Sequence, residues 1–184
     1  MSGTLILLGL VIIVVFLGVA LYNRLVTLRN RVEQSWSDVD VQLRRRHDLI
    51  PNLVETVRGY ASHERETFQQ VTAARAAAVA AGGVQERAEA EGMLTQALRS
   101  LFAVAENYPE LRASENFQEL QRELTATEDR IAAARQRYNA EVRVYDTARE
   151  TVPTNIVASL FNFAEREYFE VEDPEARDPV RVQF

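Results

Sequence analysis

The feature that most constrains this chain is an apolar run from Leu5 to Leu21 that only glycines interrupt. The first charged side chain, Arg24, comes after this run. With Thr4 and Tyr22 the segment has 19 residues. As a helix that rises about 1.5 Å per residue it would be roughly 28 Å long, close to the hydrocarbon thickness of a bilayer. We therefore expect residues 1–23 to form an N-terminal transmembrane anchor, with the Tyr22 ring at the membrane interface.

A cleaved signal peptide is the alternative interpretation of this run, because Gly18-Val19-Ala20 resembles a small-x-small cleavage site. Two features favour a retained anchor instead. The four residues before the run contain no Arg or Lys, and the apolar stretch is long for a signal peptide.

Arginines on one side of the span predict its orientation. Six of them follow it closely: Arg24, Arg29, Arg31, Arg44, Arg45 and Arg46. Because basic flanks stay on the cytoplasmic side, we expect a single-pass protein of the cell membrane with a short exterior N-terminus and a cytoplasmic body.

The body has the apolar periodicity of long helices. From Leu25 onward apolar residues recur at steps of three and four, which predicts one helix from the membrane to about residue 81, kinked at Pro51 and ended by Gly82-Gly83. Further helices are predicted over residues 85–107, 114–150 and 153–165. The fold class is thus all-α: an N-terminal transmembrane helix that continues into an antiparallel bundle of long helices over residues 24–165. An acidic, extended tail is expected over residues 166–184.

Composition excludes several kinds of chemistry. The chain contains no Cys and no Lys, so thiolate nucleophiles, disulfides and Schiff-base lysines are impossible. Its formal charge of −6 argues against nucleic-acid binding, which requires a basic surface. His63-Glu64 is not followed by the second His of a zinc-protease motif. We therefore expect no catalytic residues, no metal site and no cofactor, and a protein that is not an enzyme.

An Arg-rich patch is the most suggestive polar feature, and two interpretations of it stay open. It consists of Arg44, Arg45, Arg46 and His47, and Arg46 falls where the helical stripe calls for an apolar residue. A charge there must be paired or must extend to solvent. One interpretation is an anion or lipid-headgroup contact; the other is an interhelical salt bridge to an acid such as Glu123 or Glu128.

The distribution of charge is relevant to the headgroup interpretation. Residues 24–80 hold nine Arg against seven acids, a net charge of +2, whereas residues 81–184 hold twelve Arg against twenty acids, a net charge of −8. The part of the body nearest the anchor is therefore the less acidic part, as contact with anionic lipid would require.

The start of the body predicts self-association. The first helix is longer than the second can cover, and the third can cover the remainder only if its packing is well matched. Any leftover apolar stripe near the membrane, consisting of Leu25, Leu28, Val32 and Trp36, is expected to need another surface. The anchor also concentrates copies of the chain in the membrane plane. We therefore expect a homo-oligomer.

One polar residue near the end of the body is also of interest. Asn155 follows the break at Pro153 and is expected to cap the short last helix or tie it to a neighbour.

Several segments together resemble the LemA family of bacterial proteins. They are residues 28–30 (LRN), 36–43 (WSDVDVQL), 46–54 (RHDLIPNLV), 59–64 (GYASHE), 105–111 (AENYPEL), 128–131 (EDRI), 134–139 (ARQRYN) and 153–158 (PTNIVA), followed by Phe161 and Tyr168-Phe169. The resemblance implies a single-pass membrane protein with an all-helical cytoplasmic body and no established reaction. Arg at positions where the family often has Lys, Asp146 in place of Asn, and Val152 in place of an aromatic residue are modest departures.

The sequence thus predicts a non-enzymatic, membrane-anchored helical scaffold of the bacterial cell envelope. Its expected partners are membrane lipids, other copies of itself, and membrane or envelope proteins that the sequence does not identify. The alternative is a membrane-surface or lipid-organising protein whose Arg-rich first helix contacts anionic headgroups.

Overall fold

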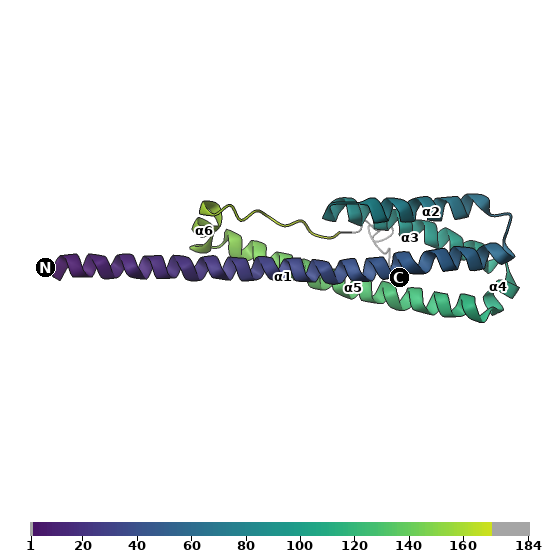
Figure 1. Cartoon of the computed structure of the whole chain (residues 1–184), viewed down its shortest axis with the longest axis horizontal. Coiled ribbons are helices and arrows are strands. Elements are labelled where there is room, and N and C mark those ends of the chain that lie inside the picture. The colour runs from purple at the N-terminus through teal and green to yellow at the C-terminus, as the bar shows by residue number, and fades with distance from the viewer. Residues whose placement is uncertain (1, 171–184) are drawn as a thin grey trace, which may run out of the picture. The chain divides into compact units, whose positions relative to one another are not determined.

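The computed structural model describes residues 2–170 of the 184-residue chain, and over these residues it is all-helical (Figure 1). The helices are α1 (Ser2–Tyr60), α2 (Arg65–Ala80), α3 (Val84–Glu106), α4 (Pro109–Ala113), α5 (Glu115–Glu150) and α6 (Thr154–Leu160). No strand occurs within residues 2–170. The predicted fold class, a long apolar N-terminal helix that packs against other long helices, is confirmed.

The described residues form two compact units. Unit 1 contains residues 2–38 and 136–167, and unit 2 contains residues 39–135 and 168–170. Helices α1 and α5 each contribute residues to both units.

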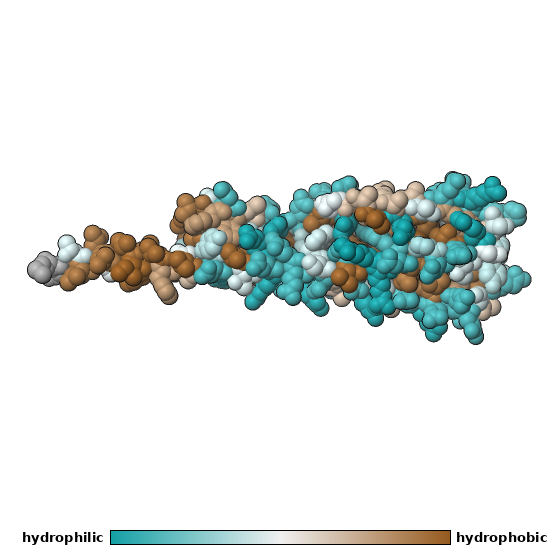
Figure 2. Space-filling model, in the orientation of Figure 1, coloured by the Kyte–Doolittle hydropathy of each residue, from teal (hydrophilic) through white to brown (hydrophobic). Residues whose placement is uncertain are grey.

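The first part of α1 is apolar and exposed. Its large side chains between Leu5 and Val19 face outward, with Phe16 77% exposed, and Figure 2 shows them as a continuous brown surface. Among the described residues, α1 is the one helix long and apolar enough to cross a membrane. A helix that is apolar on every side and covered by no other part of the protein is typical of a membrane span.

The environment of α1 changes just after Tyr22. Leu25, Leu28 and Val32 are buried in unit 1, and Trp36 packs its ring against Tyr138 of α5 with 5.2 Å between the centroids. The stripe that was expected to remain uncovered is therefore covered within the chain, because α5 is long enough to reach it. Self-association stays a prediction, but the buried side chains of this stripe offer another copy no exposed surface.

Unit 2 is held together by one core to which five helices contribute. Its buried side chains come from the second part of α1, from α2, α3 and α4, and from the start of α5. Among the most deeply buried are Leu53, Val57, Val71, Leu94, Leu101 and Leu111. Consecutive long helices fold back on one another, as Figure 1 shows for α2 and α3.

The prediction of one helix as far as residue 81 was wrong. α1 continues through Pro51 but ends at Tyr60, and a turn over residues 61–64 leads into α2. Val57, Ala61, Phe68 and Val71 are all buried in the core of unit 2. Their spacing stays close to the helical period across the turn, so periodicity alone does not mark the break. Folding α2 back buries both apolar faces in one core, which a straight helix could not do.

The last predicted helix was too long. α6 ends at Leu160, and Asn162 adopts φ = 53°, a left-handed conformation that Asn tolerates better than most residues. The Phe163 N–H donates to Ala158 O at 2.9 Å and the Asn162 N–H to Ser159 O at 3.4 Å, the two bonds of a Schellman motif that ends a helix.

The other boundaries agree closely with the sequence. α3 and α5 match the helices predicted over residues 85–107 and 114–150. The short α4, which begins with Pro109 in its first turn, was not predicted. Residues 166–170 have no regular secondary structure, and the rest of the predicted acidic tail lies outside the described residues.

The core of unit 2 predicts a contrast between two neighbours on α3. Leu94 is fully buried, whereas Met93 is 54% exposed. Leu94→Ala should lower the free energy of unfolding by about 2–5 kcal/mol because it removes buried methyl groups and leaves a cavity. Met93→Ala should change it by no more than about 1 kcal/mol. Denaturant unfolding of both variants measures the difference, and equal losses would contradict this core.

Candidate functional site

Arg46 lies at the centre of a buried polar network in unit 2. Its side chain is 2% exposed. It forms an ion pair with Glu91 of α3 through Nη2, and its Nη1 donates to Glu128 Oε1 of α5 at 2.8 Å and to Thr95 Oγ1 at 3.2 Å. One guanidinium on α1 thereby joins three helices, and its two Nη groups point at oxygen atoms as a planar fork permits.

His47 shares the same carboxylate. Its Nε2 lies 2.7 Å from Glu91 Oε1, and Arg75 Nε of α2 donates to the His47 carbonyl oxygen at 2.7 Å. Burial, followed by the charges of Arg46, Arg75 and Arg87, lowers the pKa of His47 to about 4. Asp48 acts in the opposite direction but does not offset the shift. His47 is therefore neutral near pH 7 and donates its Nε2–H to Glu91.

The outer members of the Arg-rich patch form surface ion pairs. Arg45 Nη2 lies 2.8 Å from Glu123 Oε1, and Arg44 Nη2 lies 2.7 Å from Asp40 Oδ2. Arg87 of α3 also pairs with Asp40. The patch thus includes two exposed arginines, Arg44 and Arg45, and two buried residues, Arg46 and His47.

This geometry favours the salt-bridge interpretation of the patch. The expected pair between Arg46 and Glu128 is present, and the one suggested acid that does not reach Arg46, Glu123, pairs with Arg45 instead. The four residues of the patch therefore do not present one cationic surface. In the described residues, no group of three or more His, Asp or Glu side chains is placed to hold a metal ion.

Glu91 is the functional partner that sequence reasoning missed. It lies on the same stripe of α3 as Ala88, Leu94 and Leu98, where an acid is as unexpected as Arg46 is on α1. Two opposite charges, each interrupting an apolar stripe, are a signal that could have paired them. The register between two helices determines which of their charges meet. That register cannot be predicted from the apolar stripe of either helix alone.

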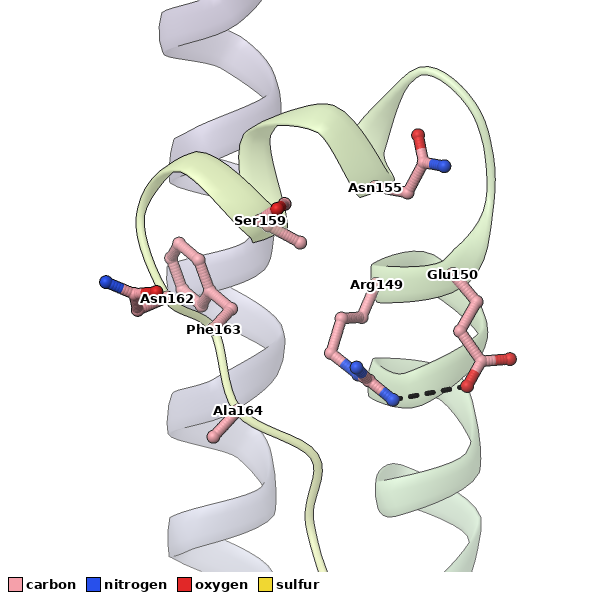
Figure 3. Close-up of a pocket in the computed structure, with 8 residues that line it drawn as sticks. Arg149, Glu150, Asn155, Ser159, Asn162, Phe163 and Ala164 are labelled. Atoms are coloured by element: carbon pink, nitrogen blue, oxygen red, sulfur yellow. Dashed lines mark hydrogen bonds and ion pairs between the residues drawn. The ribbon is translucent and has the colours of Figure 1, made fainter.

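A second candidate site lies in unit 1, where α6 packs beside the end of α5. It is an open pocket of about 540 Å³ (Figure 3). Its polar lining consists of Arg149, Glu150, Asn155, Ser159 and Asn162. Phe163, Ala158 and Ala164 complete the lining with apolar groups.

The cation of this pocket is already paired. Arg149 contacts three acids: Asp146 at 3.3 Å, Glu150 at 3.2 Å and Glu165 at 3.4 Å. Burial raises the pKa of Asp146 despite the nearby Arg149. These contacts connect the end of α5 to the segment after α6, so the charges of this pocket have a structural role.

Two tyrosines hold the same segment. Tyr145 Oη donates to Ala164 O at 2.8 Å, and Tyr138 Oη donates to Glu167 O at 2.7 Å. Burial raises the pKa of both hydroxyls, that of Tyr138 to about 12, so both remain protonated donors at neutral pH. They fix the segment over residues 164–167 along α5.

Asn155 lines the pocket in place of its predicted role as a cap. Pro153, not Asn155, occupies the N-cap position of α6. The Asn155 Oδ1 atom is buried and has no hydrogen-bond partner among the described residues. The expectation that it ties α6 to a neighbour through its side-chain oxygen is therefore not met there.

The LemA family model matches residues 35–184 of this chain. The chain belongs to the LemA family.

Three curated relatives show how far the similarity extends. The magnetosome protein MamQ 2 of Paramagnetospirillum magneticum is 28% identical over 185 aligned positions, which cover 86% of this chain and 68% of the relative. MamQ of Magnetospirillum gryphiswaldense is 26% identical with the same coverage.

The third relative carries the family name. Protein LemA of Metamycoplasma hominis is 24% identical to this chain over 173 positions, covering 89% of the chain and 78% of the relative. The matched family region includes both the Arg46 network and the α6 pocket. Both sites therefore lie in the LemA domain.

The buried ion pairs predict a large difference between two adjacent arginines. Arg46→Glu should lower the free energy of unfolding by about 3–5 kcal/mol, because it places a third carboxylate beside Glu91 and Glu128. Arg44→Glu should cost no more than about 1 kcal/mol, because the Arg44 side chain is 75% exposed. Thermal or denaturant unfolding measures both, and equal losses would contradict the burial of Arg46.

The lowered pKa of His47 predicts acid sensitivity. The unfolded chain binds a proton at this side chain near pH 6.5 and the native protein only near pH 4, so stability is complete above about pH 6.5 and decreases as the pH falls toward 4. The decrease from this residue is at most about 3 kcal/mol.

His47→Gln keeps an N–H donor for Glu91 but cannot titrate. It should reduce the loss of stability between pH 6.5 and 4, as measured by urea unfolding at each pH. His63→Gln, at an exposed position, is the matched control and should retain the full loss. An identical pH profile in all three proteins would show that His47 is not the group responsible.

Proposed function

We propose that this LemA-family protein is a non-enzymatic scaffold of the bacterial cell envelope. In this proposal α1 anchors the chain in the cell membrane by a single span, and the helical bundle is displayed in the cytoplasm to protein partners or to other copies of the chain. The observation that carries the proposal is the change along α1 from an exposed apolar surface to a one-sided buried stripe.

The continuity of α1 supports the link between anchor and bundle. The same helix supplies the apolar span and, without a break, the buried side chains of both units, from Leu25 to Val57. No linker separates the two functions. The bundle is therefore joined to the membrane through its own core helix.

The contacts of the titratable residues support a scaffold over an enzyme. Four groups with shifted pKa values, His47, Tyr138, Tyr145 and Asp146, each contact a structural partner. Perturbed groups at an active site are expected to face a cleft that a substrate can enter. Here three of the four are tied to the backbone or to an ion pair of their own unit.

The names of two relatives also fit this role. Both MamQ proteins are named after a structure, the magnetosome, and not after a reaction. We extend to this chain only the idea of a structural role.

The alternative function, a lipid-organising protein, receives less support in its original form. Of the residues expected to contact headgroups on the Arg-rich first helix, Arg46 and His47 are buried and Arg45 pairs with Glu123. Arg24, exposed and close to the end of the span, is better placed for such a contact.

Orientation is the first testable part of the proposal. Because the chain has no Cys, single cysteines can be introduced at exposed positions: Val79 on α2, Ala140 on α5, and Gly3 before the apolar run. A membrane-impermeant maleimide added to intact cells should label Gly3→Cys. It should label Val79→Cys and Ala140→Cys only after the membrane is opened. The reverse pattern would contradict the cytoplasmic orientation.

The same variants test the scaffold. Because the chain has no Lys, two permeant reagents are added to cells that carry Val79→Cys or Ala140→Cys. A bismaleimide joins two cysteine-bearing copies, and a maleimide–amine reagent joins the cysteine to a lysine of another protein. At least one of them should give discrete adducts. Adducts with tagged copies would support self-association, and a recurring second protein would support a partner. Monomers alone at both positions, with normal membrane levels of both variants, would contradict the proposal.

A further inference from the structure

Helix α6 is apolar on two opposite sides. Val157 and Ala158 are buried in unit 1, whereas Ile156 and Leu160 are 65% and 73% exposed. Ile156 and Leu160 are four residues apart and so lie on the same helix face. Val152, just before α6, and Phe161, just after it, are also more than half exposed. We refer to Val152, Ile156, Leu160 and Phe161 as the outer α6 face.

The position of this face relative to the span is fixed by ring contacts within unit 1. The Tyr22 ring lies 4.9 Å from the Phe161 ring and 5.5 Å from the Phe163 ring, both edge-on. Tyr22 is the residue with which the apolar span ends. α6 therefore lies beside α1 at the level where the span leaves the hydrocarbon.

The outer α6 face continues the apolar surface of the span. Figure 2 shows brown side chains over both the N-terminal part of α1 and the region that Figure 1 labels α6. A helix that is apolar on both sides needs an apolar environment on both. Unit 1 supplies one of them, and the medium around the span is the nearest source of the other.

Positive charge lies at the border of this surface. Arg24 and Arg143 line a shallow pocket together with Leu21, Val152 and Pro153. Cations next to apolar groups are the pattern by which a helix settles at an anionic membrane surface, with its apolar side about 5–10 Å into the headgroup region.

We propose that the outer α6 face is a second membrane contact, which inserts into the interface of the leaflet from which the body emerges. The occupant of this face is the lipid bilayer. The inference rests on the proposed anchor. It adds a second contact with the membrane beside Tyr22, and two contacts fix the tilt of unit 1 relative to the membrane, which a single span would not do.

The full-length chain in lipid nanodiscs that contain anionic lipid tests this proposal. Single cysteines at Ile156 and Leu160 are labelled with an environment-sensitive fluorophore, and quenching by lipids spin-labelled near the headgroup is measured. Both positions should show blue-shifted emission and several-fold more quenching than Ala140→Cys. Ala140 is exposed on α5 close to Tyr138, which packs on Trp36, fourteen residues beyond Tyr22 along α1.

A label in the span separates this inference from the anchor itself. Phe16→Cys should be quenched by lipids spin-labelled deep in the acyl chains. If Phe16 is quenched but Ile156 and Leu160 resemble Ala140, the α6 contact is wrong and the anchor stands. If Phe16 is not quenched either, both proposals fail. Blue-shifted emission at Ile156 and Leu160 without quenching by lipid would show that protein, such as a second copy, covers this face, and would also overturn the proposal.

A charge on the outer α6 face provides the matched variant. Leu160→Asp should abolish lipid quenching of the label at Ile156, and Leu160→Met should retain it. Helical dichroism of both variants must equal that of the parent, because Leu160 faces outward. Unchanged quenching in Leu160→Asp would count against insertion of this face.

Discussion

The structure of this protein depends on the way in which the environment of a single helix changes along its length. Before Tyr22, α1 is apolar on every side and its large side chains are exposed. From Leu25 onward α1 carries a stripe of apolar side chains that is buried. The first part requires lipid and the second requires other helices, because each large apolar side chain is less favourable in water than in an apolar environment. Every other helix in the described structure covers part of the second stripe or supports a helix that does.

The buried ion pairs are a second constraint, and they act on the register of the helices that cover the buried stripe. Arg46 interrupts the apolar stripe of α1 and Glu91 interrupts that of α3. Isolated, either charge would destabilise the core of unit 2 by several kcal/mol. Joined to each other and to Glu128, they favour one register of α1, α3 and α5, since a shift of either helix along the other would leave a charge without its partner. The desolvation of such pairs offsets much of their attraction, whereas the loss of one partner leaves an uncompensated buried charge.

The proposed function depends on which surfaces of the described residues are left uncovered. The polar groups of both candidate sites are largely engaged with one another: Arg149 with three acids, and Arg46 with two. Exposed large apolar side chains are most numerous in the N-terminal part of α1, and the outer α6 face carries four more. A chain whose charges stabilise its helices and whose apolar surface faces outward near its span is suited to positioning a bundle at a membrane.

The sequence by itself determined the all-helical class, the apolar segment long enough to cross a membrane, the bounds of α3 and α5, and the LemA family membership. These depend on local periodicity, on breakers such as Gly82-Gly83, and on motifs. It also indicated that Arg46 needs a partner. Only the tertiary structure decided that α1 ends at Tyr60, that Glu91 is the main partner of Arg46, and that Leu25, Leu28 and Val32 are covered within the chain. The reason is physical. A stripe shows that a helix must be covered, but which helix covers it, and in which register, depends on how distant segments pack together.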